Sequence, residues 1–353
     1  MAEATDLEAA VAAVEYCFEQ GWADGLPVVP PTPERVEEFL ATTPRARDEV
    51  LWRNEAVGRE CTVELAAVNA VMAGCRPEYF PVVLAAFLAA IDERSPTIGA
   101  WQSTTGGAPF FILNGPLRRQ LGFNCAGNVF GPGFRANATV GRAIRLIIAN
   151  AYGLRPHELD QATQGTPARI GLIIAENEED SPWEPLHVQL GFGPEESVVS
   201  AVHIRSCDFL DNRQTGNPEH LLNDLVDTVC RTGVLITPHH RAVLVLGPEH
   251  AELLARHGYS KRAVQEYVYE HAGHTVAQLE AVGKDGVEMP IGFIRPTRPE
   301  ERVGRSADEW RRLLKSPDDV LVVVAGAKNA GVSTVVQLFS SRAKFPGMAR
   351  VEA

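Results

Sequence analysis

Residues 122–153 combine a thiol, arginines and many glycines, a set that could bind and attack a small anion. Cys125 lies among the glycines, and Arg135 and Arg142 follow it. Glycine loses more backbone entropy on folding than other residues, so its repeated use indicates that something must approach the main chain closely. Free N–H groups, a positive helix end and guanidinium groups together favour an anion site. The alternative is a glycine-rich turn that lets two helices pack.

The apolar spacing after this loop predicts a helix, with Asn137 or Thr139 as its N-cap and Gly153 as its end. Side chains that can bind oxygen atoms recur in this loop and at the ends of predicted strands. We therefore expect the substrate to be held by Asn114, Asn128, Arg135, Asn137, Arg142, Gln164, Asn177 and His250.

Cys61 and Cys75 flank a second predicted helix, which Thr62 caps and Gly74 ends. The dipole at a helix N-terminus stabilises a thiolate, which gives Cys61 a physical reason to be reactive. Each of these cysteines could instead be a small buried residue at a helix end. The candidate nucleophiles or redox thiols are therefore Cys61, Cys75 and Cys125.

An apolar strand predicted over residues 170–175 runs directly into an acidic segment that begins with Glu176. Ligands of open α/β sheets bind outside the carboxyl ends of the strands. We therefore expect Glu176, or His187 further along the same segment, to transfer a proton. The alternative is an acidic loop that faces solvent.

A metal-dependent lyase or hydrolase is a second hypothesis, because carboxylate and imidazole groups suit iron, zinc or manganese. Its ligands would be Glu176, Glu178, His187 and His250. The chain contains no Cys-x-x-Cys and no His-Glu-x-x-His, which disfavours a preformed metal site. No particular cofactor is indicated.

Strand–glycine turn–helix units recur along the chain and begin near Phe110, Ala242 and Val320. Such a series predicts an α/β fold with a mainly parallel sheet. The first two units resemble each other, so we expect two related halves: residues 1–200, with the glycine-rich Cys/Arg loop, and residues 201–353. In the third unit a P-loop spacing is present, but Val332 replaces the phosphate-binding lysine, which disfavours nucleotide hydrolysis.

The 353 residues carry a formal charge of −12, which argues against nucleic acid or an anionic membrane as a partner. No apolar run is long enough to span a bilayer, and the acidic N-terminus does not resemble a signal peptide. We therefore expect a cytoplasmic protein whose six cysteines form no disulfide framework. Cys17 and Cys230 lie on predicted amphipathic helices and should be buried, whereas Cys125 should be reachable by solvent.

Six motifs, taken together, resemble a sparsely characterised bacterial family associated with thiol and selenol proteins that bear a UGSC motif, in which U is selenocysteine or cysteine. The motifs are GWADGLPVVPPT (residues 21–32), ECTVE (60–64), AGCRPEY (73–79), RANATVGRA (135–143), ATQG (162–165) and ENEEDSPW (176–183). The resemblance implies thiol-linked redox or sulfur chemistry. The chain itself contains no Cys-Gly-Ser-Cys, so a thiol or selenol partner protein would have to supply that motif.

The leading hypothesis is an enzyme that acts on a small anionic substrate through a cysteine thiolate. A third hypothesis, besides the metal-dependent enzyme, is a non-catalytic subunit of a thiol or selenol oxidoreductase complex. Apolar helices near the termini and the proline-rich segment around Trp22 also predict a homo-oligomer.

Overall fold

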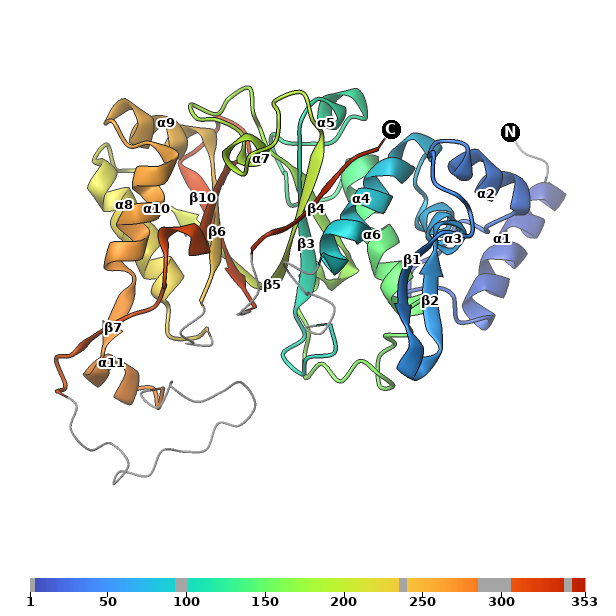
Figure 1. Ribbon diagram of the computed structural model, residues 1–353, viewed down its shortest axis with the longest axis horizontal. Helices are drawn as coiled ribbons and strands as arrows, with labels where there is room; N and C mark the ends of the chain where they lie inside the picture. The colour runs from blue at the N-terminus through green and yellow to red at the C-terminus, as the bar shows by residue number, and fades with distance from the viewer. Residues whose placement is uncertain (1–3, 93–100, 235–239, 285–305, 340–344, 353) are drawn as a thin grey trace. The chain divides into compact units, whose positions relative to one another are not determined.

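The computed structural model describes residues 4–92, 101–234, 240–284, 306–339 and 345–352 (Figure 1). The chain divides into two compact units. Unit 1 comprises Met1–Glu176, His187–His203 and Ala343–Ala353, and unit 2 comprises Asn177–Leu186 and Ile204–Arg342. Each unit is therefore built from segments that are distant in the sequence.

The strands of unit 1 combine parallel and antiparallel pairing. Strands β3 (Ala108–Asn114) and β4 (Leu172–Ala175) pair in parallel, with Leu113 opposite Ala175. The final strand, β11 (Gly347–Arg350), is antiparallel to the first part of β5 (Val198–Asp211). Strand β3 is buried along almost its whole length, which explains its continuous apolar sequence.

Unit 2 contains the rest of β5, which pairs antiparallel with β10 (Val332–Leu338). Strand β10 pairs antiparallel with β6 (Ala242–Leu246), and β6 pairs parallel with β9 (Val320–Val324). The α/β class is confirmed, but the seven-stranded sheet to which these strands belong is mixed rather than mainly parallel. The relationship between the two expected halves stays a prediction.

The prediction of a third strand–turn–helix unit is wrong, because the chain after β9 forms β10 and not a helix. Residues 332–338 include several valines and a threonine, whose branched side chains fit a pleated sheet better than a helix. Their pairing with strands on both sides, Thr334 with Phe209 and with Val245, supplies the tertiary contacts that select the strand.

Helices pack around the strands of unit 1, and two of them, α2 (Pro33–Leu40) and α3 (Val63–Ala73), begin at capping residues of the sequence. Thr62 accepts a hydrogen bond from Leu65 N, and Gly74 ends α3 with φ 85°. Further helices are α1 (Ala4–Glu19), α4 (Phe80–Ile91), α5 (Leu117–Gln120) and α6 (Arg135–Asn150). A hairpin of β1 (Val50–Asn54) and β2 (Arg59–Thr62) precedes α3. Short 3-10 turns are η1 (Glu55–Val57), η2 (Pro77–Tyr79) and η4 (Pro167–Ile170).

Helix α6 begins at Arg135, four residues before the expected cap at Thr139, so that expectation is wrong. Phe134 occupies the N-cap position and its side chain makes no capping hydrogen bond. Asn137 lies inside the first turn, where its side chain is buried and bonds to other segments. These tertiary hydrogen bonds replace the local cap.

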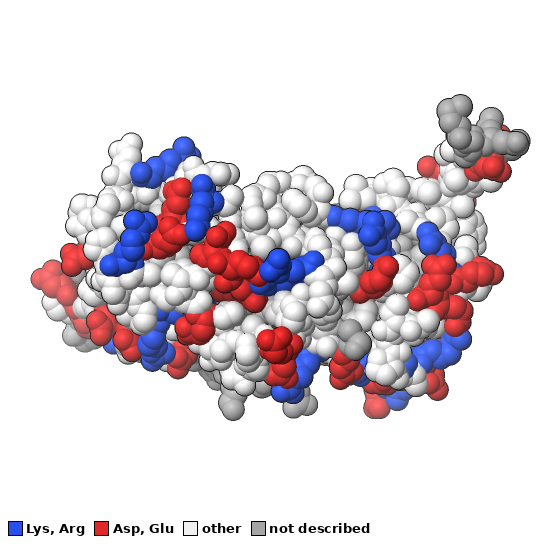
Figure 2. Space-filling model, turned by 90° about the horizontal axis from the view of Figure 1, so that it is seen from above, with Lys and Arg blue, Asp and Glu red and all other residues white. Residues whose placement is uncertain are grey.

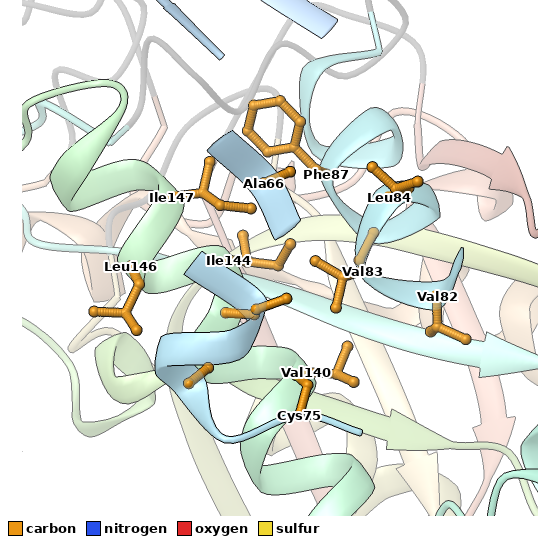
Figure 3. Close-up of a cluster of buried hydrophobic side chains, with 14 of the residues drawn as sticks. Ala66, Cys75, Val82, Val83, Leu84, Phe87, Val140, Ile144, Leu146 and Ile147 are labelled. Carbon is orange, nitrogen blue, oxygen red and sulfur yellow. The ribbon is translucent and has the colours of Figure 1, made fainter. Parts of the chain in front are cut away.

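The core of unit 1 forms where α3, α4 and α6 meet (Figure 3). Val83, Val140 and Ile144 are completely buried there. Burying one such aliphatic side chain contributes about 1.5–3 kcal/mol. Cys75 lies among these aliphatic side chains in Figure 3, which makes it part of the core.

Unit 2 has its own core of leucine and valine side chains, between its strands and helices. Its helices are α8 (Pro218–Cys230), α9 (Pro248–Arg256), α10 (Lys261–His271) and α11 (Val276–Glu280). A small hairpin joins β7 (Gly273–Thr275) to β8 (Trp310–Arg312), and the 3-10 turn η6 (Pro317–Asp319) leads into β9.

On the face drawn in Figure 2, acidic and basic side chains of the described residues are interspersed. Among the helices within the described ranges, none has both the length and the apolar character needed to cross a membrane.

Candidate functional site

The parallel strands β3 and β4 bring Asn114 and Glu176 together at their carboxyl ends. Glu176 N donates a hydrogen bond of 3.1 Å to Leu113 O, which continues the strand ladder by one residue. The Asn114 Nδ2 donates to Glu176 Oε2 at 2.6 Å. Both side chains are 0% exposed. Burying a carboxylate costs free energy unless the group is hydrogen-bonded, and Asn114 supplies such a bond here.

The glycine-rich loop is attached to the same strand ends through Asn124 and Asn137. Ala175 N donates to Asn124 O at 3.4 Å. Asn137 Oδ1 accepts from Asn124 N at 2.8 Å, and its Nδ2 donates to Asn124 O at 3.1 Å and to Ile173 O at 3.2 Å. The amide of Asn137 therefore fastens the loop to β4. Cys125 follows Asn124 directly, so the loop carries this thiol next to the segment that ends in Glu176.

The turn after β3 is held against a second segment at Gly115. This glycine has φ +88°, and a Cβ atom there would lie 2.2 Å from Glu196 O. Leu117 N donates to Ser197 Oγ at 3.0 Å on the same side. Only a glycine allows this close approach, which the Gly-Pro sequence could have suggested.

Arg118 is a buried charged residue of this region that sequence reasoning missed. It lies on α5 and is 3% exposed, whereas arginine side chains normally keep their charge in water. The signal for it was weak, because Arg118 and Arg119 are adjacent and only the fold decides which of them is buried.

His187 lies on α7 (Leu186–Gln189) and is completely buried. Neither of its ring nitrogens has a hydrogen-bond partner among the described residues. Hydrogen bonds from the Gly193 N–H and from Arg350 lower the pKa of Glu196, and the charge of His187 contributes to the same shift. His187 therefore belongs to the electrostatic surroundings of Glu196, in unit 1.

The candidate thiols differ in burial. Burial raises the pKa of Cys61 to about 12, which outweighs the helix-dipole effect expected from its position. Burial likewise raises the pKa of Cys75 to about 12, although Thr139 and Arg135 act in the opposite direction. Cys125 is half-buried. Cys17 and Cys230 are buried as predicted, and Cys207, which is not one of the three candidates, is exposed. Among the candidates Cys61, Cys75 and Cys125, the least buried is Cys125.

Arg135 and Arg142 direct their guanidinium groups at the chain itself. Arg135 Nε donates to Gly74 O at 2.9 Å, and its Nη2 donates to Cys75 O at 3.4 Å, behind the end of α3. Arg142 donates to both carboxylate oxygens of Asp24, at 3.0 and 2.7 Å. Both guanidinium groups thus donate hydrogen bonds to oxygen atoms of the chain itself, and neither arginine belongs to the candidate site.

The remaining expected ligands lie in turns or in unit 2. Asn128 adopts φ 60° and its Nδ2 donates to Pro132 O at 2.9 Å, while Gln164 is exposed. Asn177 belongs to unit 2, where its Nδ2 donates to Asp180 at 3.0 Å. His250, also in unit 2, bonds through Nδ1 to Ser333 Oγ at 2.7 Å, and burial lowers its pKa.

The metal-dependent hypothesis requires at least three close ligands. Within the ranges that the structure describes, no group of three or more histidine, cysteine, aspartate or glutamate side chains is arranged to hold a metal ion. Glu176 and His187 lie in unit 1, while Glu178 and His250 lie in unit 2.

The residues that the structure brings together are therefore Asn114 and Glu176 at the strand ends, with the Cys125 loop fastened beside them by Asn137. A carboxylate can accept a proton and can tune the reactivity of a thiol that lies close to it. Comparisons of the chain with protein-family models, with curated proteins and with solved structures gave no match.

Proposed function

We propose that the protein is an enzyme that acts on a small anionic substrate through the thiolate of Cys125, in thiol-linked redox or sulfur chemistry. One observation carries the proposal: the loop of Cys125 is hydrogen-bonded to the strand end that carries the buried Asn114–Glu176 pair. In this reading Glu176 exchanges a proton with the thiol or the substrate, and Asn114 orients the carboxylate.

The buried carboxylate supports a chemical role more than a packing role. Glu176 follows a parallel strand, at the edge where α/β sheets bind ligands. Its burial removes it from water, and in such surroundings of low dielectric constant its hydrogen bonds and charge interactions are stronger than at the surface. A cytoplasmic location, a homo-oligomer and a thiol or selenol partner protein, as the UGSC resemblance implies, belong to the same proposal.

A thiol–disulfide exchange with a charged disulfide tests both the thiol and the anion preference. The Cys125 thiolate would attack one sulfur of oxidised glutathione, form a mixed disulfide and release the other glutathione as a thiolate. Oxidised glutathione is anionic, and cystamine is a cationic disulfide of similar chemistry. We expect mass spectrometry to find the mixed disulfide at Cys125, formed at least tenfold faster with glutathione than with cystamine.

One variant makes this experiment decisive. Cys125→Ser must abolish the fast adduct, since burial raises the pKa of Cys61 and Cys75 to about 12 and that of the surface thiol Cys207 to about 11. A faster reaction with cystamine, or equal labelling of several cysteines, would contradict an anion site at Cys125.

The link between Cys125 and Glu176 has its own measurement, the pH midpoint of Cys125 alkylation by iodoacetamide. A nearby carboxylate raises the pKa of a thiol, so Glu176→Gln should lower the midpoint while leaving Asn114 an oxygen to donate to. The matched control is Glu64→Gln, an exposed carboxylate paired with Arg47. If both variants keep the wild-type midpoint, Glu176 does not act on this thiol.

A further inference from the structure

Helix α1 lies at the outer edge of the helices of unit 1 (Figure 1) and leaves apolar side chains in water along most of its length. Leu7 and Val11 are 57% and 61% exposed, and Tyr16 is 51% exposed. Of the residues of α1 whose side chains the structure describes, only Cys17 is buried. Helices of globular proteins owe most of their stability to the packing of an apolar face, so α1 is suited to packing against a second surface.

The exposed residues continue the face that packs on unit 1. Leu7, Val11, Val14 and Phe18 recur at spacings of four, three and four residues, which places them in one stripe along the helix. Val14 and Phe18 are half-buried and adjoin Cys17, which belongs to the core of unit 1. The stripe, about 16 Å long, is therefore covered at its C-terminal end and exposed at its N-terminal end.

The charged side chains beside this stripe are all acidic. Glu8, Glu15 and Glu19 recur at spacings of seven and four residues and so line one edge of the helix, while Asp6 lies in its first turn. None of these four carboxylates forms an ion pair with a described residue. The sequence has no lysine or arginine before Arg35, so the chain supplies no positive charge within this segment.

Glu15 and Glu19 are placed where they weaken the helix. They lie four residues apart, so their like charges adjoin on one face. Both are near the C-terminus of α1, where the helix dipole favours positive charge, and no basic residue occupies the last turn. Positive groups on a partner would relieve both effects. Two copies of α1 packed together would bring more carboxylates close to these two, so the charges favour a basic protein over a second copy.

We propose that α1 is a docking helix for a protein partner that presents an amphipathic helix with an apolar face and lysine or arginine edges. The partner's apolar face would cover Leu7 and Val11, because a stripe at three- and four-residue spacing fits the ridges of a second helix. Its basic side chains would lie against Glu8, Glu15 and Glu19, as charged edges do in paired helices. This inference does not depend on the function proposed for Cys125, and it leaves a homo-oligomer to other surfaces.

The test uses two synthetic peptides that share one amphipathic helical pattern, one of leucine and lysine and the other of leucine and glutamate. Fluorescence anisotropy of each labelled peptide is measured against the full chain at physiological salt. We expect saturable binding of the leucine–lysine peptide and at least tenfold weaker binding of the leucine–glutamate peptide. No saturable binding of the leucine–lysine peptide would overturn the proposal.

A substitution in the exposed part of the stripe locates the binding on α1. Val11→Asp should weaken the leucine–lysine peptide at least tenfold, although it adds a negative charge that would attract lysine. The matched control is Val57→Asp, at a valine of η1 that is 53% exposed, and it should bind like the wild type. Equal binding by all three proteins would mean that the peptide responds only to the net charge of −12, and would overturn the proposal.

A charge reversal tests the acidic edge without touching the stripe. The double variant Glu15→Lys and Glu19→Lys should bind the leucine–glutamate peptide at least as tightly as the leucine–lysine peptide. It places positive charge at the helix C-terminus, so α1 should remain folded, and it decides the question if Val11→Asp does not fold. An unchanged preference for the leucine–lysine peptide would overturn the basic partner.

Light scattering of the wild-type protein without peptide tests the competing occupant, a second copy of the chain. We expect Val11→Asp to leave the measured mass unchanged. A dimer that Val11→Asp dissociates would assign α1 to contacts between copies and would overturn the proposal.

Discussion

Arg142 and Arg145 extend from the same helix, α6, yet the fold uses them in opposite ways. Arg142 donates to Asp24 and also to Leu26 O and Pro27 O, at 3.0 and 2.9 Å. Through its Nε and Nη2 atoms the guanidinium group holds the proline-rich segment. Arg145, less than one turn further on, lines a cavity and makes no hydrogen bond to any described residue.

The difference shows that the type of residue and its place on a helix do not reveal whether an arginine forms hydrogen bonds to another segment of the fold. Arg142 resembled an anion-binding residue because it followed a glycine-rich loop, and Arg145 resembled an ordinary helix residue. What separates them is whether another segment offers acceptors to the guanidinium. Two substitutions and one pH dependence test this contrast, and they follow in order from the largest expected effect to the smallest.

Arg142→Met should lower the free energy of unfolding by about 3–5 kcal/mol, because it leaves the buried carboxylate of Asp24 without its partner. The side chains of the pair are only 14% and 7% exposed. Urea unfolding at neutral pH measures the loss. The matched control is Arg35→Met, which breaks an exposed pair with Glu38 and should cost less than about 1 kcal/mol. Equal losses of unfolding free energy in the two variants would show that Arg142 does not stabilise the fold through a buried ion pair.

The same pair predicts a pH dependence of moderate size. Burial by itself would raise the pKa of Asp24, but the hydrogen bonds and charge of Arg142 outweigh burial and lower it from 3.8. The ionised Asp24 thus stabilises the fold above its unfolded pKa, and this contribution is lost as pH falls through the lowered value. In Arg142→Met the arginine no longer acts on Asp24, so we expect burial to raise the pKa of Asp24. Protonation of Asp24 in acid then removes the buried, unpaired charge that destabilises the variant at neutral pH.

The stability gap between wild type and Arg142→Met should therefore narrow between about pH 7 and about pH 3. Urea unfolding at both pH values measures the gap. A gap that widens in acid would mean that Asp24 is not the residue destabilised by the change.

Arg145→Gln should have the smallest effect on stability, within about 1 kcal/mol of wild type. The substitution removes a charge whose ion pair with Asp160 is as long as 3.9 Å, and it breaks no hydrogen bond within the described residues. Urea unfolding at neutral pH provides the measurement. A loss of unfolding free energy as large as that of Arg142→Met would show that Arg145 also stabilises the fold.

Much of the local structure could be predicted from the sequence. Thr62 and Gly74 marked the ends of α3, and Thr32 marked the start of α2, because capping uses only atoms within a few residues. The buried strand that ends at Asn114 could also be predicted, because its apolar run is continuous. Where capping was replaced by tertiary hydrogen bonds, at the start of α6, the prediction failed.

The candidate site was predictable only in part. The rule that ligands bind at the carboxyl ends of parallel strands selected Asn114 and Glu176, and the structure joins these two by a hydrogen bond. Arg118 was missed because sequence patterns do not say which of two adjacent arginines is buried. The burial of Cys61, which raises the pKa of its thiol to about 12, was not predicted, since burial depends on the whole core and not on the local helix dipole.

By itself the sequence determined the α/β class, most helix ends and the residues that follow the strands, because these depend on contacts within a few residues along the chain. Only the tertiary structure decided how deeply each thiol is buried and which arginine forms hydrogen bonds to a distant segment. Those outcomes depend on segments distant in sequence, such as Asp24 meeting Arg142 and Asp160 meeting Arg169. The free energies of burial and of hydrogen bonding are fixed only when such segments come together.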